Sequence, residues 1–496
     1  MKYIGLSCGF HDAALSVVND DGEILFAGHS ERYSGIKHDK NIHPSLIKDA
    51  MTYVDSDDYQ LHYYERPLFK YLRKLRSGEP TDNSSIFAKN VLGKSNHELL
   101  NNKKIHTHNH HLSHAAAGFQ TSAYDHATVV VIDAIGEFDT ITIWNAKYDS
   151  SGNAKYKLLW RQTYPDSIGL FYSAMTDYVG LRPMDEEYIL MGMAGWGSDN
   201  HVSTLSNYSI NSYTNLEFLR NFHAGVDRDQ FQGLSDYDVA SCTQVVTERL
   251  IRSVMSKSKL LNASNNLVYC GGVALNCLAN RFLGEYYDNI WIMPNPGDAG
   301  SSLGAAALGY GKRINFTNAY LGHDIPGMYP VDSLVDALYA GNIVGVASGR
   351  AEFGPRALGN RSLLADPRGP DIKDRVNDIK QRQRFRPFAP VILEEYADQY
   401  FDLPRGFGSS PYMQSVARCR NPELYPAIVH VDGTSRVQTV AKDSASGIRQ
   451  LLEAWYAKTG CPMLLNTSLN IRGEPMVNDR VDADRFEYLY NIQVYS

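Results

Sequence analysis

The chain has 496 residues and a net charge of −7, with 43% hydrophobic and 21% charged residues. This length exceeds what one hydrophobic core usually supports, so at least two domains are expected. The acidic balance excludes a general attraction to nucleic acid or to anionic membranes, and no apolar run approaches the roughly 18 residues of a membrane span. Six scattered cysteines and the lack of a signal-peptide pattern predict reduced thiols, no membrane partner and a cytoplasmic location.

The N-terminal half predicts two copies of one strand pattern. Strands are expected at residues 3–8, 13–18 and 23–27, and again at 127–132, 140–146 and 156–160. An acidic turn follows the first strand of each copy. The repeat indicates a duplicated α/β fold whose two turns can face one cleft, with two unrelated hairpins as the alternative.

Two further segments divide the chain. Residues 45–105, between the copies, favour a helical insertion, and the glycines and prolines of 315–332 indicate an interdomain link. A helix at 333–340 and a strand at 343–348 then open a second domain. The predicted domains are therefore 1–325 and 331–496.

A mixed set of histidines and aspartates predicts a metal site. His110 and His114 precede an alanine run that favours a helix, which places both imidazoles on one face. Asp133 ends a predicted strand, and Asp298 lies in a loop before a helix of small residues. Two histidines and two carboxylates suit iron, manganese or zinc, although a histidine pair alone also arises from packing or chance.

Glycines beside these residues indicate a nucleotide. Gly271 and Gly272 follow a strand and precede Asn276, so backbone amides can approach a phosphate or ribose closely. Gly136 lies in the turn after Asp133. Ordinary tight turns remain the alternative for each glycine.

The second domain carries arginines within glycine- and proline-rich turns. They occur at residues 349–362, 380–390 and 430–436, and a segment with asparagines and a serine follows at 465–470. Guanidinium groups bind phosphate oxygens in pairs, so this pattern predicts a small phosphorylated substrate. Structural arginines that bind carbonyl groups are the alternative, above all for Arg350, Arg361 and Arg368.

Taken together, these motifs resemble the NodU/CmcH family of O-carbamoyltransferases over essentially the whole chain. The matching stretches are 9–14, 30–32, 37–39, 110–115, 271–276, 295–300 and the arginine-rich segments. The resemblance implies an α/β protein with an N-terminal duplicated actin-like (ASKHA, Kae1-like) domain at 1–325. It also implies a C-terminal α/β YrdC-like domain at 331–496.

The resemblance also implies an activity and roles for individual residues. The second domain would convert carbamoyl phosphate and ATP, with Mg²⁺, to carbamoyl-adenylate, and the first would transfer the carbamoyl group to an acceptor hydroxyl. Carried over by motif, the metal ligands are His110, His114, Asp133 and Asp298, with Fe²⁺ expected before Mn²⁺ or Zn²⁺. The transfer residues are His11, Asp12 and Lys37, and the nucleotide contacts are Gly136, Gly271, Gly272 and Asn276. Carbamoyl phosphate and ATP would contact Arg356, Lys380, Arg386, Arg436, Asn466 and Ser468.

Some alternatives stay open at this point. The acceptor is a sugar or natural product, or else a hydroxymethylated pyrimidine in a nucleotide or in DNA, and a homodimer is not excluded. A threonylcarbamoyl-adenylate-type tRNA-modifying enzyme is the second functional reading, and a nucleotide-binding regulator without catalysis the third. Ile189 stands where the family usually has lysine, which leaves the contacts of that helix open.

Overall fold

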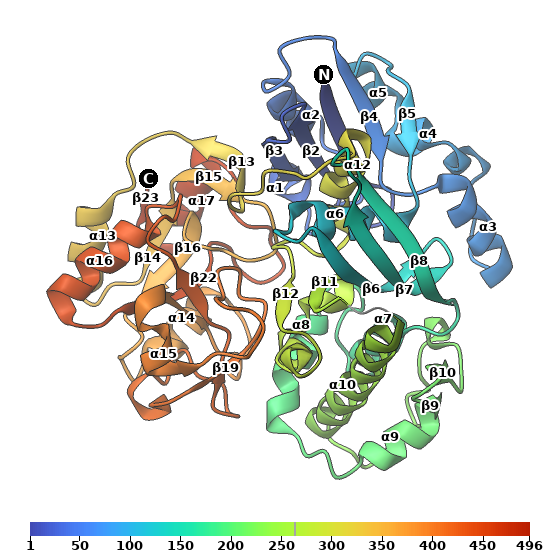
Figure 1. The fold of residues 1–496 in the computed structure, drawn as a ribbon. Coiled ribbons are helices and arrows are strands. Elements are labelled where there is room, and N and C mark those ends of the chain that lie inside the picture. Colours follow the sequence, from blue (N-terminus) through green and yellow to red (C-terminus); the bar gives the residue numbers. More distant parts are fainter. Residues whose placement is uncertain (262–263) are drawn as a thin grey trace.

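The computed structural model describes residues 1–261 and 264–496. Its N-terminal half is built on two five-stranded sheets, and its C-terminal part forms a separate unit around a six-stranded sheet (Figure 1). The two parts lie side by side. Within the described residues, none of the helices is long and apolar enough to cross a membrane.

The two N-terminal sheets share one topology. The first has the order β3-β2-β1-β4-β5, with β1 Lys2–Ser7, β2 Ala14–Asn19, β3 Ile24–His29, β4 Tyr59–Tyr63 and β5 Ile105–Thr107. The second has the order β8-β7-β6-β11-β12, with β6 His126–Gly136, β7 Asp139–Tyr148, β8 Ala154–Thr163, β11 Asn266–Cys270 and β12 Asn289–Trp291. In both, three strands form an antiparallel meander and two strands join parallel to the first strand. The predicted duplication is therefore confirmed.

Two helices lie between these sheets and pack very closely. They are α6 (His110–Thr121) and α12 (Ser301–Tyr310). A Cβ atom on Gly304 of α12 would lie 1.8 Å from the carbonyl oxygen of Ser113 in α6. A Cβ atom on Gly5 of β1 would likewise lie 1.8 Å from the carbonyl oxygen of Ser302 in α12. Glycine is therefore required for this approach, which brings α6 and the start of α12 to the same place.

The far side of the second sheet is covered by a helical layer. It contains α7 (Ile168–Tyr178), α8 (Glu187–Met193), α9 (Val202–Ser209) and the long α10 (Asp236–Leu261). Their apolar faces form a large core with β6 and β7, in which Ile189 is fully buried. Within this layer, packing against the other helices fixes the position of α8, which lies toward the C-terminal unit (Figure 1).

The prediction that residues 45–105 form a helical insertion is wrong in one respect. The segment does contain α2 (Pro44–Met51), α3 (Pro67–Ser77), α4 (Ala88–Leu92) and α5 (Lys94–Leu99). However, it also contains β4, which pairs in parallel with both β1 and β5. Four of the five β4 residues are buried, so the strand lacks the alternation that would have marked it in the sequence.

The C-terminal unit has a mixed sheet between two helical layers. Its order is β21-β17-β22-β16-β14-β23, with β14 Val344–Ala347, β16 Arg361–Ala365, β17 Ala389–Leu393, β21 Gln438–Val440, β22 Met463–Ser468 and β23 Val494–Tyr495. Helices α13 (Val331–Tyr339) and α16 (Ile448–Thr459) share one core with the sheet, while α14 (Ile372–Ile379) and α17 (Arg480–Tyr490) share another. The YrdC-like assignment of this unit stays a prediction.

The predicted link at 315–332 is more ordered than expected. It contains β13 (Tyr320–Ile325), which pairs antiparallel with β15 (Gly349–Glu352) and contacts β3. Arg350 donates hydrogen bonds to the carbonyl oxygens of Leu25 and Leu321, at 2.7 and 2.5 Å. The β13–β15 pair and Arg350 therefore connect the N-terminal and C-terminal parts. The bounds of the two domains stay predictions.

Candidate functional site

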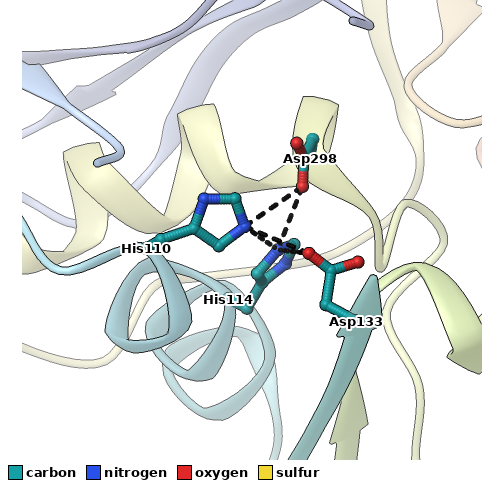
Figure 2. A group of neighbouring side chains, drawn as sticks. All are labelled: His110, His114, Asp133 and Asp298. Carbon is teal, nitrogen blue, oxygen red and sulfur yellow. Dashed lines mark hydrogen bonds and ion pairs between the residues drawn. The ribbon is translucent and has the colours of Figure 1, made fainter. Parts of the chain in front are cut away.

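The four predicted metal ligands meet in one buried cluster (Figure 2). His110 and His114 come from one face of α6, Asp133 from β6 and Asp298 from the turn before α12. The two Nε2 atoms lie 3.1 Å apart, and each lies 3.2 to 3.3 Å from Asp298 Oδ1. Nitrogen and oxygen ligands about 2.0–2.2 Å from one ion lie roughly 3 Å from one another, so the cluster has the dimensions of a divalent metal site.

Contacts outside the cluster orient the two imidazoles. His114 Nδ1 lies 3.1 Å from the carbonyl oxygen of Pro296 and 3.0 Å from Ser301 Oγ. His110 Nδ1 faces the buried carboxylate of Glu65 at 3.6 Å, and within the described chain it has no hydrogen-bond partner. Both Nε2 atoms are thereby directed at the centre of the cluster, as in histidine metal ligands generally.

Local sequence explains why these side chains converge. The Asn109 side chain accepts a hydrogen bond from the backbone N–H of Leu112 and so begins α6 one residue before His110. At Gly136 a Cβ would lie 2.4 Å from the His110 ring. The backbone N–H of Gly272 donates to Asp133 Oδ1 at 3.1 Å. These predicted nucleotide glycines therefore pack against or bind the metal cluster.

Charges within the cluster shift the pKa of three of its members. Burial opposes charge on His110, Asp133 and Asp298. The charge of Asp298 and a hydrogen bond to Asp133 nevertheless raise the pKa of His110, and the two histidines hold the pKa of Asp133 and of Asp298 below their usual range. Two histidines and two carboxylates thus form a mixed nitrogen and oxygen donor set that favours a transition metal.

Two predicted transfer residues lie beside this cluster. His11 Nδ1 is 2.8 Å from Asp12 Oδ2, and His11 Nε2 is 3.8 Å from Asp298 Oδ2. Burial alone would lower the pKa of His11, but the Asp12 hydrogen bond and the Asp298 charge raise it to about 9. The Asp12 carboxylate fixes the tautomer, so the second nitrogen of His11 is directed toward the metal cluster.

Lys37, the third predicted transfer residue, lies slightly further away. Its Nζ donates to both oxygens of Glu31 at 3.1 Å. Asp12, Glu31 and His38 are also close enough to suggest a second metal site. Because the Lys37 ammonium already binds Glu31, we interpret these groups as an ion-pair network.

The predicted substrate cations of the C-terminal unit form a second cluster. Burial and the charge of Arg436 lower the pKa of Arg356 to about 9, and burial with Arg382 and Arg386 lowers that of Lys380. Arg368 and Arg384 nearby are paired with Asp366 and Asp378. Within the described residues, no ion pair to a carboxylate is formed by the cluster members Arg356, Lys380, Arg382, Arg386 and Arg436. Clustered cations without carboxylate partners are suited to binding an anion.

Polar groups from β22 support this cluster. Lys380 Nζ donates to the Ser468 carbonyl oxygen at 2.5 Å and to Asn470 Oδ1 at 2.6 Å, and Ser468 Oγ lies 3.1 Å away. Asn466 donates to the carbonyl oxygen of Ala357, the residue after Arg356. Asn466 is fully buried, so it holds the arginine loop in place, and a direct substrate contact remains a prediction.

The anion cluster faces the N-terminal part of the chain. The Arg386 guanidinium lies 4.8 Å from the ring of Tyr188 in α8. His430 Nε2 donates to the Gly192 carbonyl oxygen at 3.0 Å, and Arg472 pairs with Glu186 at 2.7 Å. The beginning of α8 and the residues before it therefore lie between the two clusters.

Several sequence interpretations stay untested, and some residues were missed. Asn276 pairs with Gln244 and begins a short helix, which gives no direct sign of a nucleotide contact. Ile189 is buried in the core, so the position where the family usually has lysine carries an apolar side chain here. The sequence motifs gave no prediction for Glu65, His38 or Asp185. Only His38 had a signal, because it follows Lys37 in a stretch that matched the family.

The structure is a mixed α/β fold with one buried cluster of histidines and aspartates and one cluster of arginines and a lysine. The chain belongs to the carbamoyltransferase family. The family model of the carbamoyltransferase N-terminus matches residues 2–307, and that of the carbamoyltransferase C-terminus matches residues 335–495. The resemblance predicted from the motifs is thereby confirmed, and the protein is a carbamoyltransferase.

Individual relatives agree with this assignment. The chain is 34% identical to an uncharacterised protein of Synechocystis, over 97% of this chain and 93% of that one. It is 30% identical to Nodulation protein NolNO of Sinorhizobium fredii, over 95% of this chain and 76% of the relative. Among solved structures, the activator of 2-hydroxyisocaproyl-CoA dehydratase from Clostridium difficile matches 62% of this chain and 94% of its own, at 16% identity and a TM-score of 0.35. That score is too low for us to draw a conclusion from it.

Proposed function

We propose that this carbamoyltransferase converts carbamoyl phosphate and ATP to carbamoyl-adenylate at the C-terminal cation cluster. The carbamoyl group then passes to an acceptor hydroxyl beside the histidine and aspartate cluster. The observation that carries the proposal is the set of cations around Arg356 and Lys380, which are partly or fully buried and have no carboxylate partners among the described residues. Phosphate oxygens stabilise unpaired cations of this kind, and both carbamoyl phosphate and ATP carry several phosphate oxygens.

The first stage concentrates negative charge. Water attacks carbamoyl phosphate and releases inorganic phosphate and carbamate. A carbamate oxygen then attacks the α-phosphorus of ATP, which displaces pyrophosphate. Arg356, Arg386 and Arg436 would bind the phosphate oxygens, and Lys380 would stabilise charge next to them. A magnesium ion carried in with ATP would share this role.

The second stage transfers the carbamoyl group. The acceptor hydroxyl attacks the carbamoyl carbon, its proton passes to a base, and AMP leaves. In its neutral form His11 would be this base, because Asp12 holds Nδ1 and leaves Nε2 facing the metal cluster. Since the pKa of His11 is raised to about 9, the neutral fraction and the rate of transfer are expected to increase as the pH rises toward 9. Lys37 is close enough to the same loop to bind the adenylate or the acceptor.

His110, His114, Asp133 and Asp298 would hold the metal ion, for which iron, manganese and zinc all suit the donor set. When bound, such an ion supplies electrophilic assistance to a carbonyl or phosphoryl oxygen. His110 and His114 need their Nε2 atoms unprotonated to bind it. The Pro296 carbonyl oxygen favours that tautomer in His114, and the Glu65 carboxylate lies 3.6 Å from Nδ1 of His110.

The acceptor is proposed from the sequence alone. A sugar or natural-product hydroxyl comes first, and the hydroxymethyl group of a modified pyrimidine in a nucleotide or DNA comes second. AMP formation in the presence of each acceptor class separates the two. A salt-dependent shift of hydroxymethylated DNA on a native gel would additionally show DNA binding.

The test of the first stage needs no acceptor. Pyrophosphate release from ATP is measured with and without carbamoyl phosphate. Release that requires carbamoyl phosphate supports adenylation. Release that instead requires threonine and bicarbonate would replace the proposal by the threonylcarbamoyl-adenylate alternative, and no release with either co-substrate contradicts both.

A further inference from the structure

His38 connects two carboxylates near the transfer site. Its Nδ1 lies 2.6 Å from Asp12 Oδ1, and its Nε2 lies 2.8 Å from Asp185 Oδ1. Ionised carboxylates only accept hydrogen bonds, so both ring nitrogens donate and the ring is an imidazolium. His38 therefore holds Asp12 and Asp185 in fixed positions on its two sides.

The backbone around this contact adopts a costly conformation. Asp12 and His38 both lie in the left-handed region, with φ of 52° and 54°. Non-glycine residues adopt it at a cost of about 1 kcal/mol or more, and such residues concentrate at functional sites. Two backbone hydrogen bonds join their loops, from Ala13 to Asp39 and from Gly9 to Lys40. The pair is thus built into the fold and does not depend on flexible surface side chains.

On one side, the contact reaches the transfer site. Asp12 uses Oδ1 for His38 and Oδ2 for His11. The orientation of one carboxylate therefore decides whether His11 Nε2 faces the metal cluster. Without His38, the Asp12 side chain is free to rotate about its Cβ–Cγ bond and release His11.

On the other side, the contact reaches the C-terminal cation cluster. Glu186, next to Asp185, binds Arg472 at 2.7 Å, and the backbone N–H of Arg472 donates to the Lys380 carbonyl oxygen at 3.1 Å. Arg182 binds the carboxylates of both Asp185 and Glu186. One chain of direct contacts therefore runs from His11 to Lys380 across the two parts of the molecule.

We propose that His38 and Asp185 are positioning residues for the transfer stage. They hold Asp12 and His11 in place, and through Glu186 and Arg472 they make that geometry depend on contact between the two domains. This inference rests on the proposed function. Arg182 and Arg472 are partly exposed, so their ion pairs contribute little to stability, and their effect is on geometry.

The test separates the two stages in variants that tolerate the left-handed backbone. His38→Gly removes the side chain without backbone strain, and His38→Asn restores a donor toward Asp12. The first stage is read as the burst of pyrophosphate. The second is read as AMP formation with the fastest acceptor among sugars, 5-hydroxymethylcytosine nucleotide and water. Metal content is measured in each variant.

We expect AMP formation to fall about 10- to 100-fold in His38→Gly and to recover about tenfold in His38→Asn, with the pyrophosphate burst and the metal content unchanged. Equal loss in both stages, no loss in either, lost metal, or failure of His38→Asn to recover would overturn the inference. Failure of the wild-type chain to release pyrophosphate would contradict the proposed function instead.

The link between the domains is tested with Arg472→Gln. We expect it to slow AMP formation, and we expect the double variant with His38→Gly to be no slower than His38→Gly alone, because both act through one chain of contacts. Arg384→Gln is the matched control, since Arg384 forms an exposed ion pair with Asp378 in the same domain. Additive losses, or an equal loss in the control, would overturn the coupling.

Discussion

The two clusters differ in how their charges are balanced. In the N-terminal cluster, two histidines and two carboxylates contact one another and are almost completely buried. In the C-terminal cluster, arginines and a lysine lie together without carboxylate partners among the described residues. The first arrangement suits a cation held by neutral and negative donors, and the second suits an anion. The first cluster offers donor atoms to a cation, and the second offers positive charge to an anion.

The largest effect should come from breaking the metal cluster. Asp298→Asn is expected to reduce transfer to the acceptor by at least about 100-fold, because it removes a ligand that contacts both histidines. Pyrophosphate release should stay near the wild-type rate. AMP formation, pyrophosphate release and metal content of the purified variant check this. A variant that loses pyrophosphate release equally would show that the clusters do not act separately.

The converse effect should follow from Arg356→Ala. Loss of one partly buried arginine of the proposed anion site is expected to slow carbamoyl-phosphate-dependent pyrophosphate release about 100-fold, with the metal content unchanged. Arg368→Ala is the matched control, because Arg368 is already paired with Asp366. Similar rates for the two variants would contradict the assignment of the anion site.

Ligand-dependent stability should distinguish the clusters without any turnover. Pyrophosphate at about 100 times its dissociation constant is expected to stabilise the wild-type chain by about 2.7 kcal/mol, a rise in melting temperature of about 3 °C. Arg436→Ala should lose this rise, and His114→Ala should keep it. The rise in melting temperature with Mn²⁺ should instead be lost in His114→Ala and kept in Arg436→Ala. Thermal melts with each ligand alone provide the measurement, and a ligand that stabilises through the wrong cluster would refute the comparison.

The smallest expected effect concerns stability without ligands. Arg449 donates to Glu395 and Glu453, so Arg449→Gln should lower the free energy of unfolding by about 1–2 kcal/mol. Arg356→Gln should leave it unchanged or raise it, because burial and Arg436 already disfavour the Arg356 charge. Urea unfolding followed by circular dichroism compares the two. A large destabilisation in Arg356→Gln would mean that this arginine has a structural role.

Much of the architecture could be predicted because its signals are local. The meander strands, the alanine-rich helix of His110 and His114, and the small-residue helix after Asp298 all follow from short patterns. The duplication followed from a repeated order of strands and turns. β4 was missed because a short strand buried on both faces shows no alternation.

The site was less predictable wherever partners lie far apart in the sequence. His38 and Asp185 are 147 residues apart, and their contact depends on where the layer of α7, α8 and α10 places Asp185. A single sequence carries no periodic signal for such a pair. The glycines at 136 and 272 were predicted as nucleotide contacts. In the structure, a Cβ on Gly136 would collide with the His110 ring, and the Gly272 N–H binds Asp133.

The two N-terminal sheets share one strand order, and each carries an aspartate near the connection between the first two strands of its meander. Asp12 lies in the turn between β1 and β2, and Asp133 lies in the last part of β6. The two aspartates have different partners: Asp133 lies 3.2 Å from His110 Nε2 in the buried cluster, while Asp12 binds His11 and His38. One repeated chain path therefore brings two carboxylates to the same region of the molecule, and the neighbours of each carboxylate give it a different environment.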